Sequence, residues 1–309
     1  MQDAPNLDAQ LTGLGKGDWL ERLAATTDDN GHFQPLGARH LAAFIDHGGT
    51  LLVSFETIAG IRALSDRDEP MGWEFVRREG WSHLALIGDG ETWFRDRHVY
   101  AYFDRLTDDG FFEDFDRVIF HGAGPCGYAA CAYSVAAPGA TVLAVQPQAT
   151  LDPRMTEWDE RFAEMRRTSF TDRYGYAPDM LDAADHGFVL YDPAEELDAM
   201  HATLFTRRNV TKLRMRHMGG ALQGDLIEME VLHPLLVAAA DGALDEELFA
   251  ELYRARRDYP PYLRRLLAHL DARERDRLAW LLCRNVTARM KAPRFARRMQ
   301  ALEDRFGED

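Results

Sequence analysis

Short apolar runs alternate with segments of helical periodicity along most of the chain. Runs rich in branched and aromatic residues, bounded by polar turns, predict buried strands over 50–55, 83–87, 118–120, 141–145, 187–191 and 210–215. Helices are predicted over 18–25, 38–45, 99–106, 128–135 and 195–204, with a mobile, mostly helical insertion over 153–184. From residue 225 onward the pattern is helical with Arg-rich polar faces. Strands that alternate with helices predict an α/β fold with a doubly wound, mostly parallel sheet, followed by a helical C-terminal extension.

Three regions follow from this pattern. Residues 1–47 are expected to form a helical lead-in, residues 48–235 the α/β domain, and residues 236–309 the helical extension. With 309 residues, 46% of them hydrophobic, the chain is long enough to bury a full core.

Charge, hydropathy and the cysteine and histidine positions limit the expected partners, compartment and metal sites of the protein. The net charge of −15 argues against nucleic acid and against anionic membrane surfaces. No apolar run has membrane length and no signal-peptide pattern follows Met1, so a cytoplasmic protein is expected. The odd set Cys126, Cys131 and Cys283 fits a reducing compartment. The histidines lack metal-ligand spacing, so no metal site is predicted.

The most informative stretch is a glycine-rich turn between two predicted strands. Gly122, Ala123, Gly124, Pro125, Cys126 and Gly127 follow the strand at 118–120 directly and lead into the helix over 128–135. Glycines permit a sharp bend, and the free N–H groups at a helix N-terminus attract an anion or an oxyanion. Pro125 suits the first helical turn, where a missing N–H costs little. A binding site is therefore predicted at this turn.

Two interpretations of the turn remain open. As G-x-G-x-x-G it is a dinucleotide fingerprint, which would imply NAD or FAD, although Gln146 ends the next strand where that motif requires an acid. In another register it is a nucleophile elbow between strand and helix, and Gly124 then occupies the nucleophile position. On this second interpretation no cofactor is expected.

The surrounding residues support a resemblance to a known family. Trp93-Phe94 follows a predicted strand and turn, Gly122 to Ala130 matches an elbow of the form G-x-S-x-G-G-Y-A-A apart from Gly124 and Cys126, and the strand at 141–145 leads into Pro147-Gln148. Over residues 48–235 the chain resembles α/β-hydrolase-fold proteins, in particular the glycan-associated branch that includes an accessory protein of bacterial adhesin secretion.

The resemblance implies a serine on the elbow, an acid after a late strand and a histidine after the last strand. By position these become Gly124, then Asp192 or Asp198, then His217. Glycine cannot attack a carbonyl carbon, so the expected protein is a pseudoenzyme that lacks serine-type acyl transfer. Cys126 is a second candidate nucleophile, because a helix N-terminus lowers the pKa of a thiol.

Two further residues are candidates for contact with a ligand at the turn. His121 precedes the turn, and Trp93 follows a strand that should end at the same edge of the sheet. The sequence thus predicts non-hydrolytic binding of a small molecule or glycan, or an accessory role in glycan or acyl metabolism. A protein partner is expected through the C-terminal helices. The alternatives are a Rossmann-type NAD- or FAD-dependent oxidoreductase and a cysteine-dependent hydrolase.

Overall fold

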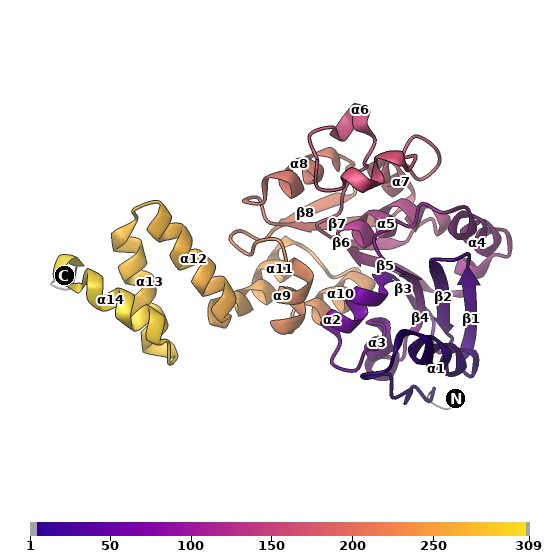
Figure 1. Cartoon of the computed structure of the whole chain (residues 1–309), viewed down its shortest axis with the longest axis horizontal. Helices are drawn as coiled ribbons and strands as arrows, with labels where there is room; N and C mark the ends of the chain where they lie inside the picture. Colours follow the sequence, from indigo (N-terminus) through magenta and orange to yellow (C-terminus); the bar gives the residue numbers. More distant parts are fainter. Residues whose placement is uncertain (1–4, 307–309) are drawn as a thin grey trace.

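The computed structural model describes residues 5–306. Its centre is one eight-stranded sheet of β1 (Gly31–Leu36), β2 (His40–Ile45), β3 (Thr50–Thr57), β4 (Ser82–Gly88), β5 (Arg117–Ala123), β6 (Thr141–Val145), β7 (His186–Tyr191) and β8 (Val210–Arg214) (Figure 1). The strand order is β1-β2-β4-β3-β5-β6-β7-β8. β2 runs antiparallel to both its neighbours, and the other strands are parallel. The predicted mostly parallel, α/β-hydrolase-like sheet is confirmed.

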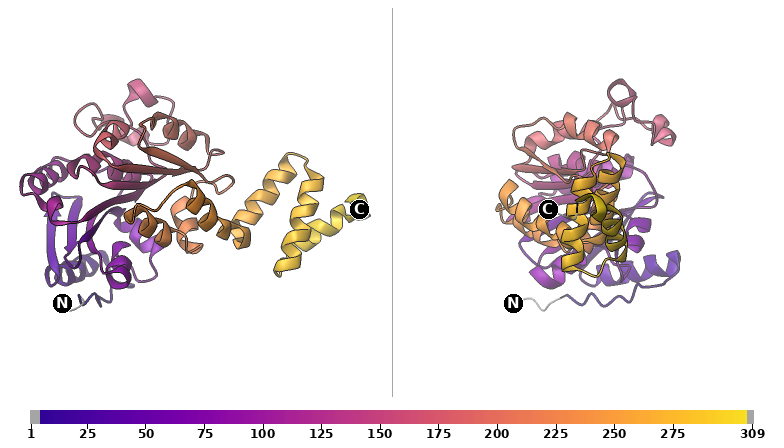
Figure 2. Two further views of the ribbon diagram at one scale, coloured as in Figure 1. Left: turned by 180° about the vertical axis from the view of Figure 1, so that it is seen from behind. Right: turned by 90° about the vertical axis from the view of Figure 1, so that its left-hand side faces the viewer.

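Helices cover both faces of the sheet (Figure 2). One face packs against α4 (Arg97–Asp108), α5 (Pro125–Tyr133) and α8 (Glu196–Leu204). The opposite face packs against α1 (Lys16–Asp28), α2 (Ile58–Leu64), α3 (Gly72–Glu79), α9 (Leu222–Glu228), α10 (Leu232–Ala240) and α11 (Glu246–Leu252). Leu51, Val53 and Phe55 of β3 face the first set, whereas Leu52 faces the second. A central strand with buried side chains on both faces is typical of doubly wound sheets.

The predicted helix over 38–45 is wrong. This segment is strand β2, which is buried along its whole length between β1 and β4. Its Leu and Ala residues favour a helix in isolation, but pairing on both sides outweighs a propensity difference of a few tenths of a kcal/mol per residue. The expected helical lead-in over 1–47 therefore contributes two strands to the sheet.

The insertion after β6 is less helical than predicted. It contains only short turns, α6 (Pro153–Thr156), η3 (Ala163–Arg167), α7 (Ala177–Met180) and η4 (Leu181–Ala183). Arg95, which precedes α4, anchors it: the guanidinium is almost fully buried and donates to the carbonyls of Ser169 (3.1 Å) and Arg173 (2.7 Å). It also pairs with Asp172. These contacts tie the insertion to the segment between β4 and α4.

Three helices stand apart from the sheet: α12 (Pro260–Ala272), α13 (Asp276–Arg289) and α14 (Pro293–Phe306) (Figures 1 and 2). They enclose a separate small core that includes Leu263, Leu267, Trp280, Cys283 and Phe295. The extension that was expected from residue 236 thus projects only from Pro260, because α10 and α11 pack on the sheet.

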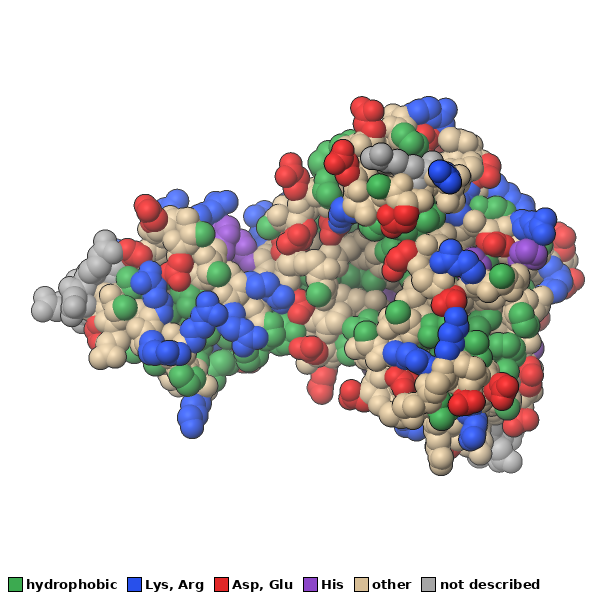
Figure 3. Space-filling model, in the orientation of Figure 1, with side chains coloured by type: hydrophobic (Ala, Val, Ile, Leu, Met, Phe, Trp, Pro, Cys, Tyr) green, Lys and Arg blue, Asp and Glu red, His purple; other side chains and the backbone are tan. Residues whose placement is uncertain are grey.

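The charge of the chain is divided between these two parts. Residues 260–309 hold 12 Arg and Lys against 7 Asp and Glu, a net +5, whereas residues 1–259 hold 24 against 44, a net −20. Arginine and lysine side chains gather on the projecting helices (Figure 3). No helix in residues 5–306 is both long and apolar enough to cross a membrane.

Candidate functional site

The turn after β5, which the sequence predicts as an elbow, bends sharply at Gly124. Gly124 is the N-cap of α5 with φ 55° and ψ −124°, a conformation that is costly for residues with a side chain. Its N–H donates to the Val145 carbonyl at 2.8 Å, and its carbonyl accepts the Tyr128 N–H at 2.9 Å. A Cβ built on Gly124 would meet nothing within 4 Å. The apex of the turn therefore has open space where a side chain at this position would project.

The residues that flank Gly124 allow β5, α5 and β6 to pack closely at the turn. A Cβ on Gly122 would lie 2.3 Å from the Cys126 carbonyl oxygen, so only glycine allows strand and helix to approach this closely. A Cβ on Gly127 would lie 3.1 Å from the Val145 carbonyl oxygen. Pro125 is the first residue of α5, as predicted, and Ala123 ends β5. The predicted binding turn is thus a rigid junction between β5, α5 and β6.

This elbow lies beside the point where the order of the strands reverses. From β3 the chain crosses outward to β4, and from β5 it crosses the other way to β6, so the crevice lies between the carboxyl ends of β3 and β5. Ligands of open α/β sheets bind at such a switch point. The residues to examine are therefore those that end β3 and β5.

A buried polar cluster that the sequence analysis missed ends β3. The Ser54 hydroxyl donates to Glu56 Oε1 (2.6 Å), and the Met71 N–H donates to Glu56 Oε2 (3.1 Å). His83 Nε2 of β4 contacts the Ser54 hydroxyl at 2.8 Å. A Cβ on Gly72 would lie 2.1 Å from the His83 ring, so this glycine lets α3 lie over the imidazole. Alternating polar residues in the otherwise apolar strand 50–57 were the available signal.

Burial governs the ionisation of this cluster. Burial raises the pKa of Glu56 to about 7. The hydrogen bonds from Ser54 and Met71 lower this pKa, but their effect is smaller than that of burial. Burial also lowers the pKa of His83 to about 3. Near neutral pH the Glu56 carboxyl is therefore protonated in part of the molecules and can act as a donor, while the imidazole stays neutral.

His121 lies one strand further along, in register with Ser54. Its Nδ1–H donates to the Leu143 carbonyl at 2.8 Å, and burial lowers the pKa of the ring to about 4. Nε2 is buried and has no hydrogen-bond partner among the described residues. The predicted ligand contact of His121 has no direct support here, because the ring is fully enclosed within the protein.

Cys126 lies in the first turn of α5 and is partly exposed. Burial of the thiol raises its pKa, and the carboxylates of Glu91 and Glu56 raise it further. This direction is opposite to the lowering expected at a helix N-terminus, because the desolvation and the two negative charges outweigh the amide dipoles. The thiol is thus a poor nucleophile at neutral pH. Cys131 and Cys283 are buried.

Asp192 and His217 follow β7 and β8, where the resemblance places an acid and a base. However, Asp192 accepts the N–H of Ala194 (2.9 Å) and the N–H of Gly219 (2.8 Å), and no hydrogen bond within residues 5–306 joins it to His217. The His217 ring instead packs against His269 of α12, with centroids 4.3 Å apart. Burial and the neighbouring His269 lower the pKa of His217, against a smaller opposing effect of Asp192. The acid and base occupy the expected loops without forming a relay.

The alternative acid, Asp198, belongs to a different network. It accepts Gln146 Nε2 (2.6 Å) and Arg161 Nη1 (2.7 Å), and Gln146 Oε1 accepts the Leu222 N–H at 3.2 Å. The side-chain amide of Gln146 is therefore already bonded at both ends, at the position where a dinucleotide site needs a free carboxylate.

Trp93 is a core residue. It is fully buried, its ring meets Phe162 of the insertion edge to face at 4.6 Å, and its φ of 50° marks a sharp turn after β4. It therefore ties the insertion to the sheet rather than lining an open site.

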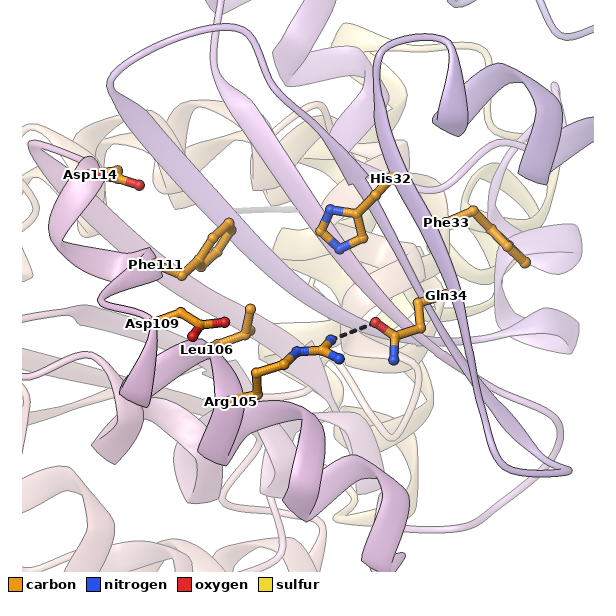
Figure 4. A pocket seen from close by; sticks show the side chains of 8 residues that line it. All are labelled: His32, Phe33, Gln34, Arg105, Leu106, Asp109, Phe111 and Asp114. Carbon is orange, nitrogen blue, oxygen red and sulfur yellow. Dashed lines mark hydrogen bonds between the residues drawn. The ribbon is translucent and has the colours of Figure 1, made fainter.

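A depression of about 450 Å³ lies elsewhere, between β1, α4 and η1 (Phe111–Asp114) (Figure 4). Its lining includes His32, Asp109 and Phe111, and Arg105 reaches across to the Gln34 side chain. None of the residues predicted for the site lines it. No group of His, Cys, Asp or Glu within the described residues has the arrangement of a metal site.

Comparison with known proteins adds remote structural likenesses. No family model matches the chain, and no curated protein sequence matches it. Among solved structures it is similar to the Glycosylation Associate Protein (Gap123) complex from Streptococcus agalactiae, with 11% identity and a TM-score of 0.42 over 66% of this chain and 45% of that one. It is also similar to Est1E from Butyrivibrio proteoclasticus (10%, 0.40; 66% and 97% of the chains). A hyperthermophilic esterase from the archaeon Pyrobaculum calidifontis gives 12% and 0.41 over 82% and 93%. Because these TM-scores lie below 0.5, the fold is assigned from the observed strand order and strand directions of the sheet.

Proposed function

We propose that this protein is a non-hydrolytic member of the α/β-hydrolase-like fold, which binds a small acyl or sugar ligand at its elbow or supports another enzyme of glycan or acyl metabolism. The observation that carries the proposal is Gly124: elbow backbone angles, open space at the apex, and no side chain to attack a substrate. Without a nucleophile, a hydrolase scaffold retains only binding and oxyanion contacts.

The surroundings of the elbow favour a neutral ligand group. Glu56 and Glu91 both raise the pKa of the Cys126 thiol, which means that the potential next to the first turn of α5 is negative. An anionic group would be repelled there, whereas a carbonyl or hydroxyl oxygen can accept from the backbone N–H groups at the start of α5. Acyl carbonyls and sugar hydroxyls are the ligand groups that meet this description.

The test combines turnover with ligand binding. Wild-type protein should hydrolyse p-nitrophenyl acetate no faster than its Gly124→Leu variant, and a panel of acetylated monosaccharides should raise the Tm of wild type only. Gly139→Leu is the matched control, because Gly139 also has positive φ (85°) and open space around it. It precedes β6, at the opposite end of the strands from Gly124. Saturable ester turnover by wild type that Gly124→Leu abolishes would sink the proposal.

The two alternatives make different predictions. A dinucleotide site requires NAD or FAD to raise the Tm, which we do not expect because Gln146 is bonded to Asp198 and Leu222. A cysteine hydrolase requires rapid alkylation of Cys126 by iodoacetamide at neutral pH. The raised pKa of this thiol predicts slow alkylation instead.

A further inference from the structure

The sheet ends in a strand whose outer edge is open. β8 pairs with β7 alone, and the register joins Val189 to Lys212 and Tyr191 to Arg214. The Met215 N–H donates to the Tyr191 carbonyl at 2.8 Å, so Met215 and, two residues earlier, Leu213 direct their backbone groups toward β7. The backbone N–H and C=O of Lys212 and Arg214 consequently point away from the sheet. An open edge of this kind is a template for another strand.

A groove of about 570 Å³ runs along this edge. All five residues of β8 line it, and Glu246 and Phe249 of α11 complete it. Leu213 is buried against the core that includes Phe249, whereas Lys212 and Arg214 lie on the opposite face of the strand. The face of β8 toward α11 therefore presents Leu213 and Phe249 together with Thr211 and Glu246, and the opposite face of the strand is basic.

The charge of this region is opposite to that of the chain as a whole. Residues 199–224 hold five Arg and Lys and no Asp or Glu, in a chain of net charge −15. Ion pairs with Asp179 and Asp182 hold Arg207, but no ion pair within residues 5–306 includes Lys212, Arg214 or Arg216. Burial and the neighbouring Arg214 lower the pKa of Lys212, so an anion at this edge would relieve an unfavourable environment.

We propose that β8 accepts an extended segment of a partner protein as a ninth strand. The segment alternates acidic residues, which face Lys212 and Arg214, with apolar residues, which face Leu213 and Phe249. Main-chain hydrogen bonds supply affinity in this mode of recognition, and alternate side chains supply specificity. Opposite charges across neighbouring strands stabilise the pairing, whereas two copies of β8 would bring like charges together. The occupant is therefore a partner with acidic character and not a second copy of this chain.

The experiment uses the full-length protein and a fluorescein-labelled peptide in which Glu alternates with Val and Thr. Saturable binding is expected by fluorescence anisotropy at low salt. The double variant Lys212→Glu/Arg214→Glu should weaken it by about tenfold or more and should bind a peptide with Lys in place of Glu. Lys291→Glu/Arg294→Glu is the matched control, because both residues are exposed near the start of α14 and carry the same charge change.

Hydrogen exchange distinguishes strand addition from charge attraction alone. Bound peptide should slow exchange of the Lys212 and Arg214 amides, and Lys212→Pro, which removes an outward N–H only, should weaken binding while the protein keeps its Tm within a few degrees. Absence of binding at millimolar peptide overturns the proposal. Equal binding of the acidic peptide to wild type and to the charge-reversed variant also overturns it, as does unchanged exchange of the Lys212 and Arg214 amides. A wild-type dimer in sedimentation that Lys212→Glu dissociates would overturn it as well.

Discussion

At the scale of single residues, the most consequential groups are the ones enclosed next to the elbow. Glu56, His83 and His121 are all buried on one face of β3, β4 and β5, in strands whose other residues are mainly apolar. Burial shifts the pKa of the carboxyl and of the imidazoles in opposite directions. Stability should therefore depend on pH in two opposite ways.

For Glu56 the folded-state pKa of about 7 lies above the ordinary value of 4.5. The free energy of unfolding associated with it is fully retained below pH 4.5 and is lost as pH rises to 7, because the folded state must give up a proton that it holds more tightly. As pH rises from 4.5 to 8, wild type should therefore lose about 3 kcal/mol of its free energy of unfolding relative to the Glu56→Gln variant. Urea unfolding at both pH values measures the difference, and a difference independent of pH would contradict the raised pKa.

For His121 the sign is reversed. Its folded-state pKa of about 4 lies below 6.5, so its contribution is retained above pH 6.5 and is lost as pH falls toward 4. His121→Asn should remove this acid sensitivity, at the cost of a smaller side chain in the core. The slope of the unfolding free energy between pH 6.5 and 4.5 is the measurement, with His98→Asn as the control, because His98 is exposed.

At the scale of elements, the sequence was most informative for strands and helices whose structure follows from their own local sequence. The alternation of apolar runs and helices predicts β3 to β8 and α5, and a glycine or proline close to at least one end of each element except β8 marks its boundary. β2 was missed because its strand character arises from pairing with β1 and β4, which no local pattern records. Similarly, the loops of Asp192 and His217 follow from chain order, whereas the packing of His217 against His269 depends on an extension that lies 52 residues further along.

The insertion after β6 offers a prediction about one anchor. Arg95 is enclosed by carbonyls of Ser169 and Arg173, and its guanidinium lies over the rings of Tyr100 and Phe170 at 5.2 and 5.3 Å. Arg95→Met should leave these carbonyls without a donor and release the insertion locally, by about 3 kcal/mol. Limited proteolysis should then cut within 165–176. Arg154→Met should leave the cleavage rate unchanged, because the Arg154 side chain is exposed and, among the described residues, pairs with Asp152 alone.

At the scale of the whole molecule, an acidic α/β body carries a basic helical extension that has its own core. Polar contacts attach the two at several points: Arg265 of α12 donates to Asp225 at 2.6 Å, and Arg289 of α13 pairs with Asp258 and donates to the Arg257 carbonyl at 2.9 Å. In addition, the His217 ring packs against His269. The attachment therefore includes one buried carboxylate, one imidazole pair and the ion pair between Arg289 and Asp258.

This attachment should weaken in acid. Burial and then the neighbouring His269 lower the pKa of His217 below its usual value, so the contact is fully retained above pH 6.5 and is lost as pH falls. Small-angle scattering at pH 7.5 and pH 5.5 should show a broader distribution of extension positions at the lower pH, and His269→Gln should remove most of that change. Asp225→Asn should loosen the extension at both pH values, because Arg265 and Tyr259 lose a charged acceptor. An extension equally fixed in wild type and both variants would mean that the remaining contacts hold it in place, namely the pair between Arg289 and Asp258 and the apolar contacts of Tyr262.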